Sequence, residues 1–411
     1  MNRISALVCG FVNLANATLL ADLFGTFFDF LVFHTATRAV MVGALSTVYD
    51  AAALTELQNT LQGSAFDFRP FLYPPIWLLY LIPFGFLSTT AAVVVFLAFT
   101  CGFCVFALRS FNFGWISIVA ILTSPAAIWV VIVGQNTFLS MALFYAGLAL
   151  LHRRPTTAGI LLGLLVYKPQ LCMLVPLALI AARAWRPLAA MSITVASMSA
   201  VSLAVFGSDL WFDFLQTARH ASTDIVAMAS FAQVHATLFA AAKTMGLSND
   251  VAMAMQFAGA GIAGVIVIVV FARYRLTDES IAILLAATFL ASPYLLTYDL
   301  LLLMPAATLL FLHPRHDRRH FHETSVYLSV LMIPTFGIFL NQAGLPIIPL
   351  IIGLFGATAW HRLHLTNDTQ QRVGCPQRAA TQPLGRQAGL TQLLRLGYGD
   401  GFGEAAGGAK A

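Results

Sequence analysis

The sequence predicts an all-α protein that crosses a membrane many times. Of its 411 residues, 59% are hydrophobic and only 9% are charged, and the mean hydropathy is +0.83. Soluble domains carry about 25% charged residues, so a soluble chain of this length could not cover its surface with so few charges. Lipid must therefore be the main solvent. This excludes a nucleic-acid-binding protein, a coiled coil, a secreted disulfide scaffold and a disordered chain.

The basic residues and the cysteines add little beyond this. The isoelectric point of about 9.1 comes from arginines scattered in small clusters rather than on one basic face, which fits membrane orientation better than binding to a phosphate backbone. Cys101 and Cys104 have the spacing of half a zinc site, but no second pair or nearby histidine completes it. They are interpreted as small buried hydrophobes.

Apolar windows locate the membrane spans, because a spanning helix needs about 20 predominantly apolar residues. The first window follows Arg3 and is interpreted as a span rather than a signal peptide, since polar residues replace the small-residue cleavage site. Windows of about this length are 4–24, 90–108, 115–133, 187–206, 251–271, 279–295, 325–340 and 345–360, with shorter ones at 137–151 and 298–312.

Two segments do not fit a single span. Residues 157–182 are too many for one span and are interrupted by Lys168-Pro169, so two short helices are expected to meet near Lys168. Residues 75–88 hold only about 13 apolar residues, a length that suits a re-entrant or interfacial helix. The sequence therefore predicts a bundle of about twelve transmembrane helices over residues 1–365, with short outward-facing helices.

Arginine positions set the orientation of this bundle. The clusters can all lie on the cytoplasmic side if 157–182 goes out and back and 75–88 does not cross, which also makes both termini cytoplasmic. The longer, more acidic loops 25–74 and 207–250 then face outward. The tail 366–411 is rich in Gln, Arg and Gly and is expected to be a disordered cytoplasmic segment. The arginine clusters that this orientation places on the cytoplasmic side consist of Arg109, Arg153, Arg154, Arg183, Arg186, Arg273, Arg275, Arg315, Arg318, Arg319 and Arg362.

A group of histidines lies among the last of these arginines, at positions 313, 316, 320 and 322. The cations beside them favour a positive-inside anchor over a zinc tract. No metal site and no cofactor are therefore expected. The sequence also has no P-loop, HExxH or GxSxG motif, and no GxGxxG after a strand.

Lys168 is the one basic residue that this orientation places at an outward tip, within an apolar stretch. A charge at such a depth costs several kcal/mol unless a cavity or a partner accommodates it, which makes the residue a functional candidate. The alternative is a side chain that snorkels to the interface.

Other polar residues are expected on the same outward side. Asp29 follows the first span between two phenylalanines, where partial desolvation would make its carboxylate a better general base; the alternative is an ordinary helix-end acid. Gln135 and Asn136 form a tight turn whose amides could cap helices or bind a sugar. Tyr73 precedes two prolines as an interface aromatic, and Asp299 could cap a helix or bind substrate.

These features together suggest a reaction at the outer surface. A lipid-linked donor in the outer leaflet could place its phosphate beside Lys168 and its sugar beside Asp29. The carboxylate would deprotonate an acceptor hydroxyl while the cation stabilises the leaving phosphate. Such a donor needs no nucleotide.

Five motifs follow Asp29 in order along the chain: YPP (73–75), GQN (134–136), RRP…AGILLGLLVYKPQL (153–171), RAWRP (183–187) and ASPYLLTYDLLLL (291–303). Their order resembles glycosyltransferase family 87, whose members are membrane enzymes of the GT-C fold. The resemblance covers about residues 1–360 and implies inverting transfer of a hexose, usually mannose, from a polyprenyl phosphate to a lipid-linked or envelope glycan. It implies a periplasmic active site in the bacterial inner membrane and a general-base aspartate, here Asp29.

The expected site residues follow from the motifs and their outward position. His34 and His235 stand where the family pattern has other residue types and would alter the acceptor site. The donor would be bound by Lys168, Gln170, Arg69 and Tyr73, and the remaining substrate contacts would come from His34, Gln135, Asn136, His235, Tyr298 and Asp299.

Two other functions are compatible with the sequence. A lipid flippase or secondary transporter would use Lys168 and Asp29 as coupling charges, although the chain shows no two matching halves. A structural subunit of an envelope assembly would depend on neither charge. The expected partners are the polyprenyl-phosphate sugar, the acceptor glycan and membrane lipid, with no nucleic acid.

Overall fold

The computed structural model describes residues 28–62, 70–227, 235–274, 276–312 and 321–372. Within these ranges every regular element is a helix, and the only β-type pairing is an isolated bridge between His235 and Leu296. The all-α prediction is therefore confirmed for the described part of the chain. Several expectations fall outside it: the span 4–24, Arg69, the histidines at 313, 316 and 320, and the tail from residue 373 onward.

Three helices are long and apolar enough to cross a membrane: α5 (Thr89–Ser110), residues 185–219 of α11 (Trp185–Ala227), and α14 (Asn249–Arg273). Two bent pairs raise the number to five if each counts as one span. One joins α6 (Trp115–Leu122) to α7 (Pro125–Val133) at 54°, and the other is the bend within α17 (Phe321–Gln342). The protein is a multi-pass membrane protein, but the described residues do not show twelve spans.

Shorter helices account for much of the difference. Residues 75–88 form the ten-residue α4 (Ile76–Gly85), in agreement with the prediction of a helix too short to cross. Residues 157–182 form α9 (Pro155–Gly163) and α10 (Val175–Ala181), separated by the 3-10 turns η2 (Leu164–Tyr167) and η3 (Pro169–Leu171). The predicted break at Lys168 is therefore confirmed.

The predicted span 279–295 is also shorter than expected. It forms α15 (Asp278–Ala291), a helix of 14 residues of which nearly all are buried in protein. The other helices are α2 (Phe28–Met41), η1 (Leu45–Val48), α3 (Ala51–Gln62), α8 (Thr137–Leu150), α13 (Leu238–Thr244), η4 (Thr297–Leu302), α16 (Leu303–Leu312) and α18 (Ile348–Arg372).

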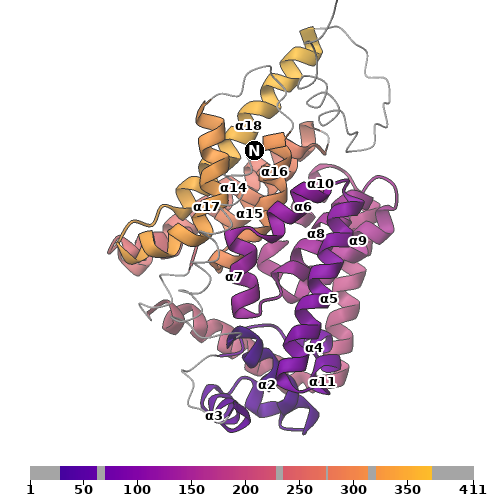
Figure 1. Ribbon diagram of the computed structural model, residues 1–411, viewed down its shortest axis with the longest axis vertical. Coiled ribbons are helices and arrows are strands. Elements are labelled where there is room, and N and C mark those ends of the chain that lie inside the picture. Colours follow the sequence, from indigo (N-terminus) through magenta and orange to yellow (C-terminus); the bar gives the residue numbers. More distant parts are fainter. Residues whose placement is uncertain (1–27, 63–69, 228–234, 275, 313–320, 373–411) are drawn as a thin grey trace, which may run out of the picture.

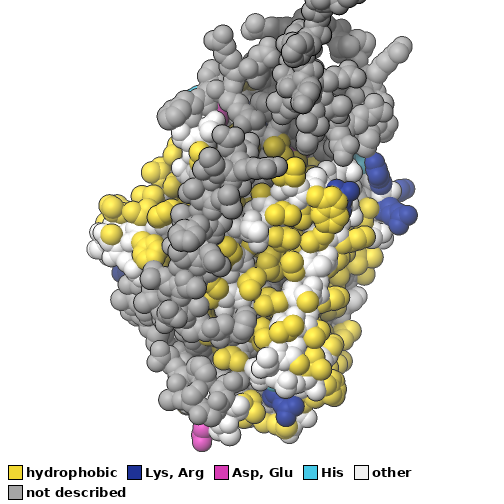
Figure 2. Space-filling model, viewed as in Figure 1, with side chains coloured by type: hydrophobic (Ala, Val, Ile, Leu, Met, Phe, Trp, Pro, Cys, Tyr) yellow, Lys and Arg dark blue, Asp and Glu magenta, His cyan; other side chains and the backbone are white. Residues whose placement is uncertain are grey.

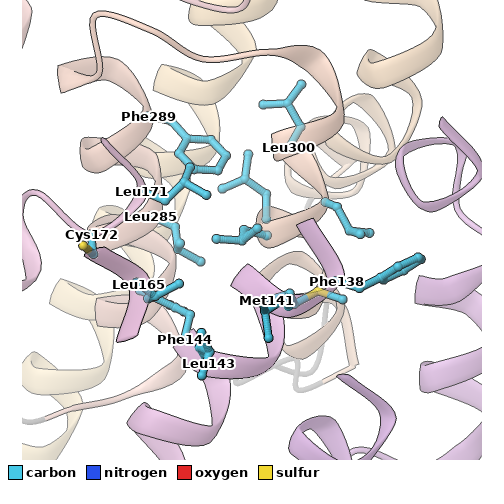
Figure 3. Packing of buried hydrophobic residues seen from close by; sticks show 14 of the residues in the cluster. Phe138, Met141, Leu143, Phe144, Leu165, Leu171, Cys172, Leu285, Phe289 and Leu300 are labelled. Atoms are coloured by element: carbon cyan, nitrogen blue, oxygen red, sulfur yellow. The ribbon is translucent and has the colours of Figure 1, made fainter. Parts of the chain in front are cut away.

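The helices form two groups that meet along a common core. In Figure 1, α4, α5, α8, α9 and α11 lie together, α2 and α3 lie at their lower end, and α14 to α18 form the upper left part. The core between the groups is made by α8, the break around Lys168, α15 and η4, whose apolar side chains converge in Figure 3. Those shown there include Phe138, Met141, Phe144, Leu165, Leu171, Leu285, Phe289 and Leu300.

Two glycines allow α9 to pack closely against α11. A Cβ at Gly159 would collide with the backbone oxygen of Pro187, and a Cβ at Gly163 would lie 2.8 Å from the backbone oxygen of Met191. Glycines four residues apart on one helix face let two backbones approach, which favours helix association in membranes. This contact fixes the start of α11 beside the start of α9.

The α8–α9 hairpin separates two chemically different ends. Arg153 and Arg154 lie at the tip between the helices, while Asn136 and Lys168 lie at the other end, separated by the 14 residues of α8, or about 21 Å. Arg183 and Arg186 precede or begin α11 and so lie at the same end as Arg153. Figure 2 shows a group of Lys and Arg side chains at the upper right of a largely hydrophobic face, with further ones at its lower edge.

Candidate functional site

A glycine ends α7 and creates the turn that carries two buried amides. Gly134 has a left-handed backbone conformation, with φ of 73°, which glycine adopts without steric cost. The N–H groups of Gly134 and Gln135 both donate to the oxygen of Val130, at 3.0 Å each, and α8 starts two residues later. The turn leaves Gln135 and Asn136 2% and 0% exposed, so both amides need hydrogen-bond partners inside the protein.

Gln135 connects the turn to Asp29. Its Nε2 donates to Oδ2 of Asp29 at 2.7 Å, and its Oε1 accepts hydrogen bonds from the hydroxyl of Tyr73 at 3.0 Å and from the N–H of Asn136 at 3.1 Å. Asp29 lies in the first turn of α2 and is half-buried, where the helix dipole favours negative charge. Three predicted site residues that are far apart in the sequence therefore form one hydrogen-bonded chain.

Lys168 forms a buried ion pair with Asp299. The Nζ of Lys168 lies 2.6 Å from Oδ1 of Asp299, and the two side chains are 1% and 0% exposed. The same ammonium donates to Oδ1 of Asn136 at 3.2 Å, and Thr137 donates to Asp299 at 3.2 Å. Lys168 therefore does not snorkel to the interface, and the partner that its burial requires is Asp299.

Aromatic side chains surround this ion pair. The rings of Tyr298 and Tyr73 lie 5.1 and 5.9 Å from the Lys168 ammonium, a range in which the ring face attracts a cation. Burial raises the pKa of Tyr73 well above its usual value, and the carboxylates of Asp299 and Asp29 raise it further. The phenol therefore stays protonated at neutral pH and can donate to Gln135.

The structure adds residues that sequence reasoning missed. Thr137 bonds to Asp299 and could have been found, because it directly follows the Gly134–Asn136 motif and begins α8. Burial raises the pKa of the half-buried Tyr294, and Tyr73 and the carboxylates of Asp29 and Asp299 raise it further. Its position within the 291–303 motif was the available signal.

Three polar atoms in this cluster have no hydrogen-bond partner among the described residues. They are Nδ2 of Asn136, Oδ2 of Asp299 and Oγ1 of Thr297, all of them buried. Buried polar groups are nearly always paired. The cluster can therefore accept and donate further hydrogen bonds, which suits a polar ligand.

The family model for glycosyltransferase family 87 matches residues 71–293, more than half of the chain. The chain belongs to glycosyltransferase family 87. No curated protein and no solved structure matches it. The matched range contains Tyr73, Gln135, Asn136 and Lys168, whereas Asp29 and Asp299 lie on either side of it. As a family-87 glycosyltransferase, the protein acts on a sugar donor and an acceptor in a membrane.

His34, another residue predicted at the site of this glycosyltransferase, bonds to residues outside the hydrogen-bonded chain. In the imidazole of His34, Nε2 lies 3.2 Å from the backbone oxygen of Leu87 and Nδ1 lies 3.3 Å from Oγ1 of Thr89. Both ring nitrogens therefore have hydrogen-bond partners. Gln170 is half-buried two residues after Lys168. These positions leave Asp29, Tyr73, Gln135, Asn136, Lys168, Tyr298 and Asp299 as the residues brought together.

His235 lies at the edge of the site. Its segment is bridged to Leu296, and its backbone oxygen accepts a hydrogen bond from Nδ2 of Asn341 at 3.2 Å. The imidazole meets the ring of Tyr294 edge-on, with centroids 5.2 Å apart. The residues just before α13, in the middle of the predicted loop 207–250, are thus attached beside Tyr294.

Proposed function

We propose that this family-87 glycosyltransferase transfers a hexose, with mannose as the first candidate, from a polyprenyl phosphate to a lipid-linked or envelope glycan acceptor. Its membrane helices suit a donor whose carrier stays in the bilayer, and its sequence has none of the phosphate-binding motifs expected of a nucleotide site. The proposed location is a bacterial inner membrane, with the site on the outer face and both termini in the cytoplasm.

The orientation is supported by the two ends of the α8–α9 hairpin. Arg153, Arg154, Arg183 and Arg186 gather at one end, and basic residues are enriched on the cytoplasmic side of membrane proteins. Asp29, Gln135 and Lys168 lie at the opposite end. A donor in the outer leaflet would reach that end from the side of the protein.

The observation that carries the proposal is the hydrogen bond from Gln135 to the half-buried carboxylate of Asp29. An amide N–H on one oxygen favours the ionised form, which is the form that a general base needs. In the proposed step Asp29 takes the proton of the acceptor hydroxyl as its oxygen attacks the anomeric carbon. The bond from that carbon to the phosphate oxygen breaks, and the electron pair leaves with the polyprenyl phosphate. A single displacement of this kind inverts the anomeric configuration.

Lys168 is proposed to act at the leaving phosphate. An ammonium has three N–H donors, and two of them bind Asp299 and Asn136. The third has no partner among the described residues and is the group available to a phosphate oxygen. Tyr73, Gln170 and Arg69 are proposed to assist donor binding, and Asn136, Tyr298 and His235 to contact the transferred sugar or the acceptor.

The test is sugar transfer by the purified protein in proteoliposomes. A polyprenyl phosphate carrying radiolabelled mannose, or glucose in a parallel assay, is supplied together with a lipid extract as acceptor. We expect label to leave the polyprenyl phosphate and Asp29→Asn to slow this by about 100-fold or more, with donor KM unchanged. Use of a nucleotide sugar in place of the lipid-linked donor would overturn the proposal.

Asp50→Asn is the matched control for Asp29→Asn. Asp50 is an exposed carboxylate before α3, and its Oδ1 accepts hydrogen bonds from the N–H groups of Ala52 and Ala53 at 3.0 Å each. Asparagine can cap a helix in the same way, so this variant should keep wild-type turnover. Equal losses in both variants would remove the base role from Asp29.

A further inference from the structure

The amide of Gln135 has three hydrogen-bond partners that together determine which way it faces. Its oxygen accepts from the N–H of Asn136 and the hydroxyl of Tyr73, and its nitrogen donates to Asp29. If the amide were turned by half a rotation, its NH2 would face the N–H of Asn136, and its oxygen would face a carboxylate. Two donors or two acceptors cannot bond to each other, so one orientation satisfies all three contacts.

We propose that Gln135 and Tyr73 are positioning residues that hold the carboxylate of Asp29 ionised and in a single orientation for the transfer reaction. This inference rests on the proposed function, in which Asp29 takes the acceptor proton. The N–H of Asn136 belongs to the backbone of the turn made by Gly134, so the fold itself sets the direction of the amide. The NH2 group can only donate, and it therefore stabilises the carboxylate over the carboxylic acid.

Tyr73 is held in place from two sides, which makes it a fixed donor to Gln135. Its backbone oxygen accepts a hydrogen bond from the hydroxyl of Tyr49 at 2.7 Å. Its ring packs edge-on against Phe33, with centroids 5.1 Å apart, and lies 5.7 Å from that of Trp77. The hydroxyl of Tyr73 is therefore fixed in position and helps to determine the orientation of the Gln135 amide.

The experiment compares Gln135→Met and Tyr73→Phe with the wild-type protein, using polyprenyl-phosphate mannose in proteoliposomes. Methionine keeps the length of the side chain without an N–H, and phenylalanine removes only the hydroxyl. We expect kcat to fall about 10- to 100-fold for Gln135→Met and about 3- to 10-fold for Tyr73→Phe, because a misplaced catalytic group costs rate rather than binding. Donor KM should not change, and the acidic limb of the kcat–pH profile should move to higher pH.

Gln256→Met is the matched control. Gln256 is a second buried glutamine, whose Oε1 accepts from the N–H of Phe239 and whose Nε2 donates to the oxygens of Leu290 and Ala291, each at 3.1 Å. Its loss should lower the unfolding temperature and leave the pH profile of the folded protein unchanged. If Gln135→Met behaves like this control, its role is structural and the inference is wrong.

Asp29→Asn separates this inference from the proposed function. If Asp29→Asn keeps wild-type turnover, Asp29 is not the base and both ideas fail. If Asp29→Asn abolishes turnover while Gln135→Met leaves kcat and its pH profile unchanged, only the positioning role fails. Adding Gln135→Met to Asp29→Asn should cause no further loss of turnover, because the effects of substitutions at residues that act as a unit are not additive. If the double variant loses turnover by the full additional factor of Gln135→Met, the inference is also contradicted.

Discussion

The ammonium of Lys168 lies 2.6 Å from the carboxylate of Asp299, and water reaches neither side chain. The two residues are 131 positions apart, so the ion pair joins the break in the α9–α10 region to η4. Removing two charges from water is costly. Their attraction offsets this cost only when further hydrogen bonds support both groups. Here Asn136 accepts from Lys168, and Thr137 donates to Oδ1 of Asp299.

This ion pair predicts that each single substitution destabilises the protein more than the double substitution does. Lys168→Met or Asp299→Leu alone leaves a buried charge without its partner and should destabilise the protein by about 3–5 kcal/mol. The double variant Lys168→Met/Asp299→Leu removes both charges and should regain most of the wild-type unfolding temperature. Thermal unfolding of the four purified proteins in detergent measures this, and a double variant no more stable than the singles would contradict it.

The stable double variant also tests the proposed role of Lys168 at the donor. Without the cation, the leaving phosphate loses its proposed partner, so donor turnover should be lost although the protein is folded. Wild-type turnover in the double variant would limit the pair to a structural role. The single variants cannot decide this question, because their folding defect would mask a catalytic one.

The proposed orientation predicts which surface positions face the outside of the cell. In a protein whose native cysteines are replaced, Thr60→Cys on α3 should react with a membrane-impermeant maleimide in intact cells. Arg153→Cys should react only after the cells are opened; both residues are exposed. The opposite pattern would invert the protein in the membrane and move the site to the cytoplasmic side.

The close contact between α9 and α11 predicts a strong effect of a side chain at Gly159. Gly159→Leu would drive a side chain into the backbone of Pro187 and should destabilise the protein by about 3 kcal/mol, at the upper end of the cost of overpacking. Gly261→Leu on α14 is the control, because a Cβ there meets open space. Equal unfolding temperatures for the two variants would show that the helices can separate without cost.

The lowered pKa of His34 predicts that the protein loses stability in mildly acidic solution. Burial lowers the pKa of His34 below 6.5, the nearby Arg38 lowers it further, and the hydrogen bond to Leu87 opposes them. As the pH falls below about 6.5, the imidazole of His34 takes up a proton in the unfolded chain before it does so in the folded protein. The contribution of His34 to stability is therefore complete above that pH and declines below it. Unfolding temperatures of the wild type should fall between pH 7.5 and 5.

A variant that cannot titrate identifies the source of this decline. His34→Gln should show a shallower pH dependence than the wild type over the same range. His152→Gln, at an exposed histidine in the α8–α9 turn, should retain the wild-type slope. An unchanged slope in His34→Gln would attribute the effect to another group.

The breaks in the helices could be predicted from the sequence because they depend on local chemistry. Lys168-Pro169 interrupts an apolar stretch, Gly134 ends α7 with a positive φ, and residues 75–88 are simply too few to cross. Proline and glycine act through their own backbone, so the neighbours of these residues hardly matter. The grouping of Asp29, Gln135 and Lys168 at one end of the bundle was predicted for a similar reason, since the side on which a loop is expected follows from charge and length.

The pairings within the site could not be predicted in this way. Sidedness places Asp29 and Gln135 on one surface but gives no distance between residues 106 positions apart. Asp299 was expected to cap a helix or bind substrate, and its contact with Lys168 depends on how η4 packs. The number of spans could not be predicted for a related reason: an apolar helix such as α15 has the same composition whether lipid or protein surrounds it.

The ion pair has a consequence for how the chain is made. The ribosome delivers Lys168 to the membrane well before it has synthesised Asp299, so for that interval a positive charge lies among apolar helices without its partner, at a cost of several kcal/mol. Translation beyond η4 removes this penalty. A chain that stops between the two residues keeps this unpaired charge permanently. The cell's quality control would therefore recognise the truncated product as a membrane-insertion defect rather than as a nearly complete enzyme.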